Sequence, residues 1–230
     1  MFIEQLINGL TLGSIYALFA LGYTMVYGIL LMINFAHSEI FMVGAYIGFL
    51  VLFSIPVFCP QLLPVYFLLY FILPMLGAGL LAVIIEKIAY KPLRHACRLT
   101  PLISAMGVSI FLQNLIMLTV GAQSKTYPEK LPIIQFHLFG VQISSLQIFI
   151  FGLSILLMIT LHIFISKTKL GKAIRAVAEN HIVAQLMGIN VNTIISLVFL
   201  IGGGLGGIAG VLNGLYYGSI KYNMGFLPGI

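Results

Sequence analysis

Long apolar stretches separated by short polar segments are the dominant pattern of this chain. Five intervals contain no formally charged residue, and each is long enough for the ~20 apolar residues of one helical membrane crossing. These intervals are bounded by Glu4 and Glu39, Glu39 and Glu86, Arg98 and Lys125, Lys130 and Lys167, and Glu179 and Lys221. The short apolar–polar alternation of a membrane β-barrel is lacking. The pattern therefore predicts an all-α, polytopic transmembrane helical bundle, a single domain over residues 1–230 with about seven membrane segments.

The first apolar interval is ambiguous in its number of crossings. Residues 5–55 can form two long spans or three short ones, one of them broken near residues 32–39. Gly22 and Gly28 divide the apolar run, so we favour three spans. Three crossings place the N-terminus on the cytoplasmic side, whereas two place it outside.

Composition and charge agree with a membrane location. Hydrophobic residues make up 61% of the chain and charged residues only 7%, against about 25% charged residues in soluble domains. The net charge of +6 comes largely from residues 87–98 and 167–175, which hold four lysines or arginines each. The positive-inside rule assigns both segments to the cytoplasm, and the stretches 56–64 and 123–145 then lie outside. The basic residues thus indicate orientation in a membrane, and no nucleic-acid partner is expected.

One polar cluster interrupts the apolar pattern near the N-terminus. Asn34, His37 and Glu39 lie between two strongly apolar segments. As part of a discontinuous helix beside a translocation pathway, they would face the bundle interior and interact with a polar solute. As a short solvated loop, they would only connect two spans, with Asn34 initiating a helix. The sequence supports both interpretations equally.

A second polar segment, residues 167–190, precedes the last apolar interval. Residues 171–190, GKAIRAVAENHIVAQLMGIN, are rich in alanine and contain no proline, which favours a helix. Ile182 with Leu186 and Val183 with Met187 give this helix an apolar face at i, i+4 spacing. The segment is too polar to span a membrane. We therefore expect a cytoplasmic amphipathic helix that lies on the membrane surface or docks in a groove of a partner.

Glycines recur at every fourth position in the last apolar interval, and they are Gly202, Gly206, Gly210, Gly214 and Gly218. Such a ladder places small residues on one helix face and lets a neighbouring backbone approach closely. Tight packing within the chain is the favoured interpretation. A subunit interface and a pathway lining are the alternatives.

Motifs for catalysis and metal binding are missing from the sequence. It has no Gly-x-Ser-x-Gly elbow, no His-Glu-x-x-His pair and no phosphate-binding loop, and its histidines share no ligand spacing. We therefore expect no catalytic residue, no metal and no cofactor in this chain. Any chemistry with ATP and Mg²⁺ would belong to a separate partner subunit.

Two segments together match one known pattern. Residues 8–39, NGLTLGSIYALFALGYTMVYGILLMINFAHSE, closely resemble the start of the branched-chain amino acid ABC transporter permeases of the LivH type, in the LivHM permease family. Ser38 stands where that family typically has glycine. Residues 171–190 resemble the family's cytoplasmic coupling loop, and the candidate coupling residues are Gly171, Arg175, Ala178, Glu179 and Gly188. The similarity covers nearly the whole chain, but relatives continue beyond its end, so we expect a permease truncated at its C-terminus.

The resemblance implies a membrane-spanning permease subunit of an ATP-binding cassette importer, which moves branched-chain amino acids across the bacterial cytoplasmic (inner) membrane. It also implies ABC ATPase subunits, a second homologous permease and an external solute-binding protein as partners, besides the amino-acid substrate and membrane lipid. Docking on an ATPase becomes the favoured role of residues 167–190. The permease itself is expected to be no enzyme, since it provides a path without altering the substrate.

Three other functions stay open on the sequence alone. A permease for urea or short amides fits the same family, because an external binding protein sets much of the specificity. An ion-coupled secondary transporter would need buried ionisable groups, and Glu39 is the only acidic candidate near a span. A truncated, non-functional remnant is the third alternative.

Overall fold

The computed structural model describes residues 2–54, 63–94, 96–97, 99–127, 135–138 and 141–226. Its membrane-length helices are α1 (Phe2–Leu30), α2 (His37–Ser54), α3 (Leu63–Ile85), α4 (Leu99–Val120), α5 (Ser145–Lys167) and α8 (Val191–Tyr217). Shorter helices are the π-helix η2 (Glu86–Tyr90), the 3₁₀ turn η3 (Lys91–Leu93), α6 (Lys169–Glu179) and α7 (His181–Leu186). Four short strands are β1 (Lys125–Thr126), β2 (Gln135–Leu138), β3 (Val141–Ser144) and β4 (Ser219–Ile220). The predicted all-α bundle is therefore confirmed.

Six helices of the described residues are long and apolar enough to cross a membrane, close to the expected number of about seven. The difference arises in the first apolar interval, where the structure has two long helices, so our preference for three spans is wrong. Gly22, which seemed to divide the apolar run, lies inside α1 against the carbonyl oxygen of Gly202. The missing side chain of Gly22 lets α1 pack closely against α8, and the helix continues through this position. If the positive-inside rule holds for residues 87–98, two crossings predict an N-terminus on the outside.

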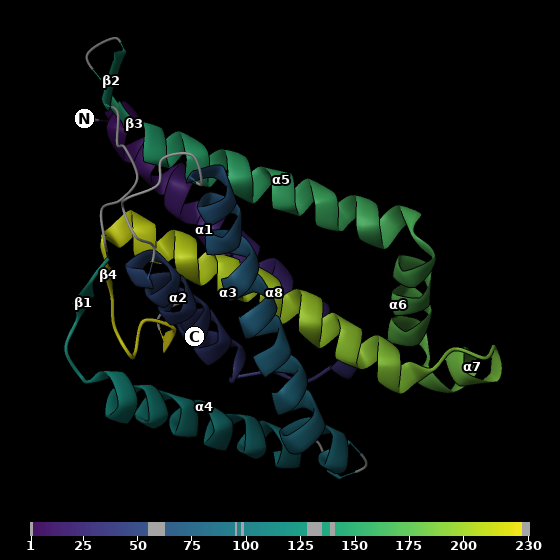
Figure 1. Ribbon diagram of the computed structural model, residues 1–230. Coiled ribbons are helices and arrows are strands. Elements are labelled where there is room, and N and C mark those ends of the chain that lie inside the picture. Colours follow the sequence, from purple (N-terminus) through teal and green to yellow (C-terminus); the bar gives the residue numbers. More distant parts are fainter. Residues whose placement is uncertain are drawn as a thin grey trace.

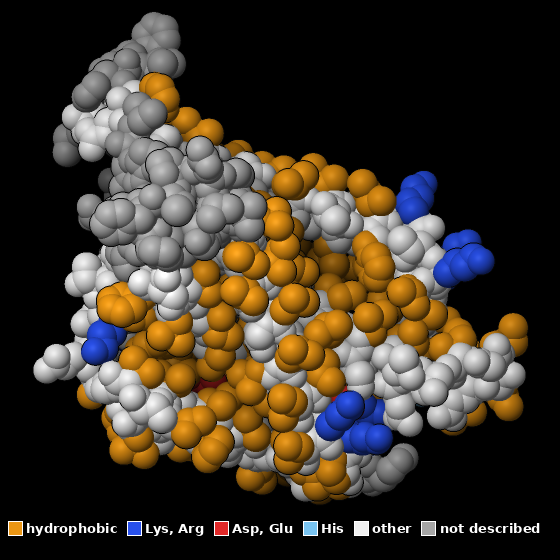
Figure 2. Space-filling view, viewed as in Figure 1, with side chains coloured by type: hydrophobic (Ala, Val, Ile, Leu, Met, Phe, Trp, Pro, Cys, Tyr) orange, Lys and Arg blue, Asp and Glu red, His pale blue; other side chains and the backbone are white. Residues whose placement is uncertain are grey.

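Helix α8 runs through the middle of the bundle, and α1, α2 and α3 pack around it (Figure 1). Most residues of the central part of α8 are buried, whereas few of those of α4 are. Helix α5 lies along α1, whereas α4 lies on the opposite side and touches the bundle at α2 and η2. Apolar side chains cover much of the outer surface, and lysine and arginine side chains gather near the helix ends (Figure 2). This distribution suits a bundle surrounded by lipid.

One face of α8 carries glycines that admit the backbones of α1 and α2. A side chain at Gly202 would meet the carbonyl oxygen of Gly22 at 2.7 Å, and one at Gly210 would collide with the carbonyl oxygen of Phe41. Gly206, between them, faces the ring of His37. Helices held this closely gain dispersion contacts, which replace the hydrophobic drive that lipid does not supply.

The adjacent face of α8 packs against α3 in the same way. Gly203 faces Ala82, and Gly207 faces Ala78 and the carbonyl oxygen of Pro74. Gly218 does not continue the ladder as we expected, because it ends α8 in a left-handed conformation with φ of 62° and has open space around it.

The end of the bundle opposite α6 and α7 is tied by short strands and one buried tyrosine. β1 pairs antiparallel with β4, and β2 pairs with β3 ahead of α5. Tyr127, directly after β1, inserts its ring between α2 and α8, where Gly48 and Gly214 leave room for it. Its hydroxyl lies 3.2 Å from the Tyr70 hydroxyl and 3.2 Å from the carbonyl oxygen of Ala45. Most of the stretch 56–64, predicted to lie outside, falls beyond the described residues.

Glycine packing around α8 predicts that two glycine-to-alanine substitutions have very different effects on the stability of the protein. Gly210→Ala would force α2 away from α8, and we expect it to lower the free energy of unfolding by roughly 1–3 kcal/mol, as overpacking does in other cores. Gly152→Ala, in α5, has open space and gains helix propensity, so its stability should be equal or slightly higher. Thermal unfolding of the detergent-purified variants compares the two. Equal midpoints would contradict the close α2–α8 packing.

Candidate functional site

A bend with buried polar side chains joins α1 to α2. Residues 31–36 leave the helical conformation after Leu30, and α2 begins at His37. Leu31 has a left-handed backbone with φ of 53°, which costs a residue with a side chain roughly 1–2 kcal/mol. Asn34 and His37 are only 2% and 1% exposed. The solvated-loop interpretation is therefore wrong, and the bend depends on contacts from neighbouring elements.

Asn34 is held from the end of α3. The hydroxyl of Tyr90, on η2, donates a hydrogen bond of 2.6 Å to Oδ1 of Asn34. The amide nitrogen Nδ2 is buried, and among the described residues it has no hydrogen-bond partner. Leaving such a donor unpaired costs about 1–3 kcal/mol. This amide is therefore available to a polar group that enters the bundle.

His37 occupies a small compartment between α1 and α8. Its ring lies 5.0 Å from that of Phe19 and 5.8 Å from that of Tyr23, measured between centroids. Gly22 and Gly206 leave the space that the imidazole fills. Gly22 lies about two turns before the end of α1. Since His37, the first residue of α2, lies beside Gly22, α2 begins inside the bundle. Neither ring nitrogen has a hydrogen-bond partner within the part of the chain that the structure describes.

Glu39 is fully buried where α2 meets α4. Its Oε1 accepts hydrogen bonds from Gln113 at 2.8 Å and Ser109 at 3.0 Å, both on α4, and from Ser38 at 3.3 Å. All three donors are neutral. Its second oxygen, Oε2, has no partner among the described residues. An ionised carboxylate in such a place is costly unless a positive charge reaches it.

The three predicted pathway residues are thus all buried and close in sequence, but a different element holds each of them. Asn34 contacts η2, His37 lies between α1 and α8, and Glu39 bonds to α4. Each has a polar atom without a partner in the described residues. Together they carry an amide donor, an imidazole and a carboxylate oxygen that the described residues leave without hydrogen-bond partners.

A buried ion pair near the bend was not predicted from the sequence. Glu86, on η2, pairs with Arg94, and its Oε2 accepts a hydrogen bond of 2.8 Å from Ser196. Arg94 also donates a hydrogen bond of 2.7 Å to Oδ1 of Asn192. These bonds fasten the end of α3 to the start of α8. In the sequence, Glu86 is a lone carboxylate at the end of a long uncharged run. We interpreted it only as the boundary of that run.

Residues 171–190 form two helices, so the expectation of one helix is wrong. α6 ends at Glu179, and the side chain of Asn180 accepts hydrogen bonds from the backbone N–H groups of Ile182 and Val183 at the start of α7. An asparagine that bonds to the backbone in this way competes with helix continuation. The segment therefore turns at Asn180, and α6 crosses the ends of the spans that flank it (Figure 1).

The candidate coupling residues take different structural roles. Gly171 is buried, and a side chain there would collide with backbone carbonyls at the end of α5. Arg175 donates a hydrogen bond to one of those carbonyls. Ala178 and Glu179 are exposed on α6. Gly188 follows α7 with a left-handed φ of 81°, which glycine adopts without strain. The first two residues fix the corner between α5 and α6.

Comparison with known protein sequences points to one family of membrane transport proteins. The family model described as "Branched-chain amino acid transport system / permease component" matches residues 5–230. The high-affinity branched-chain amino acid transport system permease protein BraD of Pseudomonas aeruginosa is 46% identical over all of this chain and 76% of its own length. The corresponding LivH of Escherichia coli is 40% identical over the same shares. A probable LivH of Methanocaldococcus jannaschii is 32% identical over 86% of this chain and 62% of its own length.

No solved structure matches the chain. The relatives and the six apolar helices identify a multi-pass protein of the bacterial inner membrane. The chain belongs to the family of branched-chain amino acid transport permeases.

Proposed function

We propose that the chain is the membrane-spanning permease subunit of an ATP-binding cassette importer that translocates branched-chain amino acids. The family and the names of the relatives support this function. The observation that carries the proposal within this chain is Glu39, a fully buried carboxylate with only neutral donors around it. An amino acid brings the ammonium group that such a carboxylate lacks.

The place of Glu39 fits a translocation pathway between α2 and α4. Helix α4 is the least buried of the six spans and meets the bundle mainly at α2 and η2. Ser109 and Gln113 therefore leave Glu39 when α4 moves outward, and the carboxylate is then open to a solute. Further along the bend, Asn34 and His37 supply polar atoms that already lack partners among the described residues.

Removing the charge of Glu39 tests this role. Glu39→Gln keeps the size of the side chain, and we expect it to lower uptake of a radiolabelled branched-chain amino acid at least about tenfold, the worth of one charge-assisted contact. Uptake is measured in proteoliposomes that contain the complete transporter.

Two substitutions of neighbouring residues on α4 separate the loss of a hydrogen bond to Glu39 from a general change in packing. Gln113→Leu removes a donor to Glu39, whereas Asn114→Leu removes an exposed amide that bonds only to its own helix. Gln113→Leu should lower uptake, and Asn114→Leu should leave it unchanged. Wild-type uptake by Glu39→Gln would contradict the role of the charge. Uptake of urea or short amides in place of amino acids would favour the alternative substrate class.

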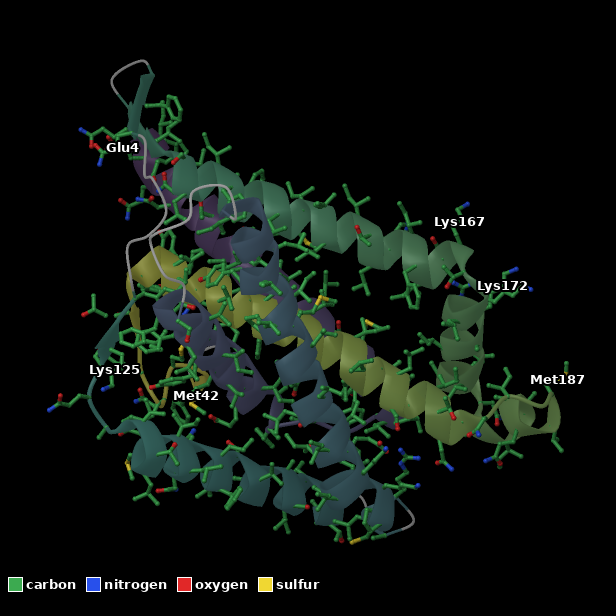
Figure 3. All side chains as sticks on the ribbon, in the orientation of Figure 1. Glu4, Met42, Lys125, Lys167, Lys172 and Met187 are labelled. Carbon is green, nitrogen blue, oxygen red and sulfur yellow. The ribbon has the colours of Figure 1, made fainter. Side chains whose placement is uncertain are left out.

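The same proposal assigns α6 and α7 to docking on an ATPase subunit. Four apolar side chains of this segment stand exposed, namely Ile182 (70%), Val183 (54%), Leu186 (81%) and Met187 (77%). Figure 3 shows Met187 at the far tip of the molecule, and Lys167 and Lys172 point outward at the corner between α5 and α6. Apolar side chains beyond the lipid need another protein surface to cover them.

The rigid corner explains how docking would move the spans. Gly171 and Arg175 lock α6 to the end of α5, so a push on α6 reaches α5 directly. In the proposed complex, the partner binds ATP and Mg²⁺ and performs the hydrolysis. A second homologous permease completes the pathway, and an external solute-binding protein delivers the amino acid.

Docking through α7 predicts a specific loss of partner binding. Leu186→Ser combined with Met187→Ser should raise the dissociation constant for the ATPase subunit at least about thirtyfold, as expected for losing a central apolar contact. Gln185→Ala, a polar neighbour on the same short helix, should bind as the wild type does. Titration of nanodisc-embedded permease with labelled ATPase measures both constants. Unchanged binding by the double variant would place the docking surface elsewhere.

A further inference from the structure

The end of α1 is held by a side chain from α7. Nε2 of His181, the first residue of α7, lies 3.0 Å from the carbonyl oxygen of Ile29. This carbonyl would accept a bond from residue 33 if α1 continued, but the chain leaves the helix at Leu31. A ring N–H of His181 therefore satisfies an acceptor that the end of the helix leaves free. The two residues are 152 positions apart in the sequence.

The bond between His181 and Ile29 lies directly before the strained part of the bend. Leu31, two residues after Ile29, has the left-handed backbone, and Asn34 and His37 follow within one short segment. A side chain that fixes Ile29 therefore fixes the start of the bend. If that side chain moves away, Leu31 is free to relax toward an ordinary conformation and the residues after it must shift.

A second set of contacts reaches the bend from the same part of the chain. Tyr90 holds Asn34, and the η2 helix that carries Tyr90 is fastened to α8 by Glu86. The bond from Glu86 goes to Ser196, which lies in the second turn of α8, shortly after α7. Both contacts on the bend thus depend on the position of residues 181–196. The exposed face of α7 is the outer end of this same segment.

We propose that His181 is the positioning residue through which ATPase docking on α7 controls the bend between α1 and α2. Displacement of α7 breaks the hydrogen bond between His181 and Ile29. The backbone at Leu31 then relaxes, and Asn34 and His37 change their position in the pathway. This inference rests on the proposed function, because it takes α7 as the docking helix.

Hydrogen exchange tests the inference without depending on the transported solute. The complete transporter in nanodiscs is compared with and without a non-hydrolysable ATP analogue, and exchange is followed in peptides covering residues 29–39. We expect the nucleotide to change exchange there in the wild type. His181→Ala should abolish that change, whereas His181→Gln should keep it, because the glutamine amide can donate to the same carbonyl. Gln185→Ala, on the same helix, should behave as the wild type.

A second readout separates coupling from folding and docking. Uptake per ATP hydrolysed should fall about fivefold in His181→Ala, the worth of one hydrogen bond, with ATPase binding unchanged, and should recover in His181→Gln. A nucleotide-dependent change in exchange that persists in His181→Ala would overturn the inference, and so would loss of ATPase binding in that variant. If the wild type takes up no branched-chain amino acid but exchange follows the expected pattern, the proposed substrate fails while the role of His181 stands.

Discussion

Close backbone packing around α8 is the constraint on which the rest of the structure depends. Lipid supplies no hydrophobic drive between helices, so the spans must gain their association from contact area and from internal hydrogen bonds. Glycines on two faces of α8 let α1, α2 and α3 approach until backbone meets backbone. The same glycines create the compartment for His37, since Gly206 is both a packing residue and one wall of the site. Helix packing and the candidate pathway are therefore built from one set of positions.

The bend between α1 and α2 and the first turn of α2 carry the polar side chains of the candidate pathway. These side chains are buried, and their partners come from elements distant in the sequence: Tyr90 for Asn34, and Gln113 for Glu39. A shift of one of these elements therefore changes the surroundings of the polar group that it holds. Buried polar groups that lack some of their hydrogen-bond partners lower the free energy of unfolding. That cost is reasonable for a transport path, because a passing solute can supply the missing partners.

On the side of the bundle where α5 ends, α7 reaches the start of the bend through the contact of His181 with Ile29. The corner between α5 and α6 is stiff, because Gly171 leaves no space between the two backbones. Beyond Asn180 the segment changes direction, and His181 turns back toward the end of α1 while the apolar side of α7 stays exposed. One short helix thus has an exposed apolar face and an inner contact with the end of α1. This division is what the proposed docking of an ATPase subunit on α7 requires.

The sequence by itself determined the class of protein, the polar segments and the small-residue face of α8. Those features follow from local composition and spacing, because a membrane span must be apolar and helical over its whole length. Glycine spacing likewise predicted a packing face, although not the end of that face at Gly218.

Only the tertiary structure decided how the first apolar interval divides and what holds the bend. Gly22 resembles a helix break in the sequence, and its role as a contact for Gly202 appears only when α8 lies beside it. The pairing of Glu86 with Arg94 and the contact from His181 to Ile29 are equally invisible to local pattern, since a hydrogen bond carries no sequence periodicity. Local rules describe each helix, whereas the partners of a buried polar group depend on which helices are neighbours.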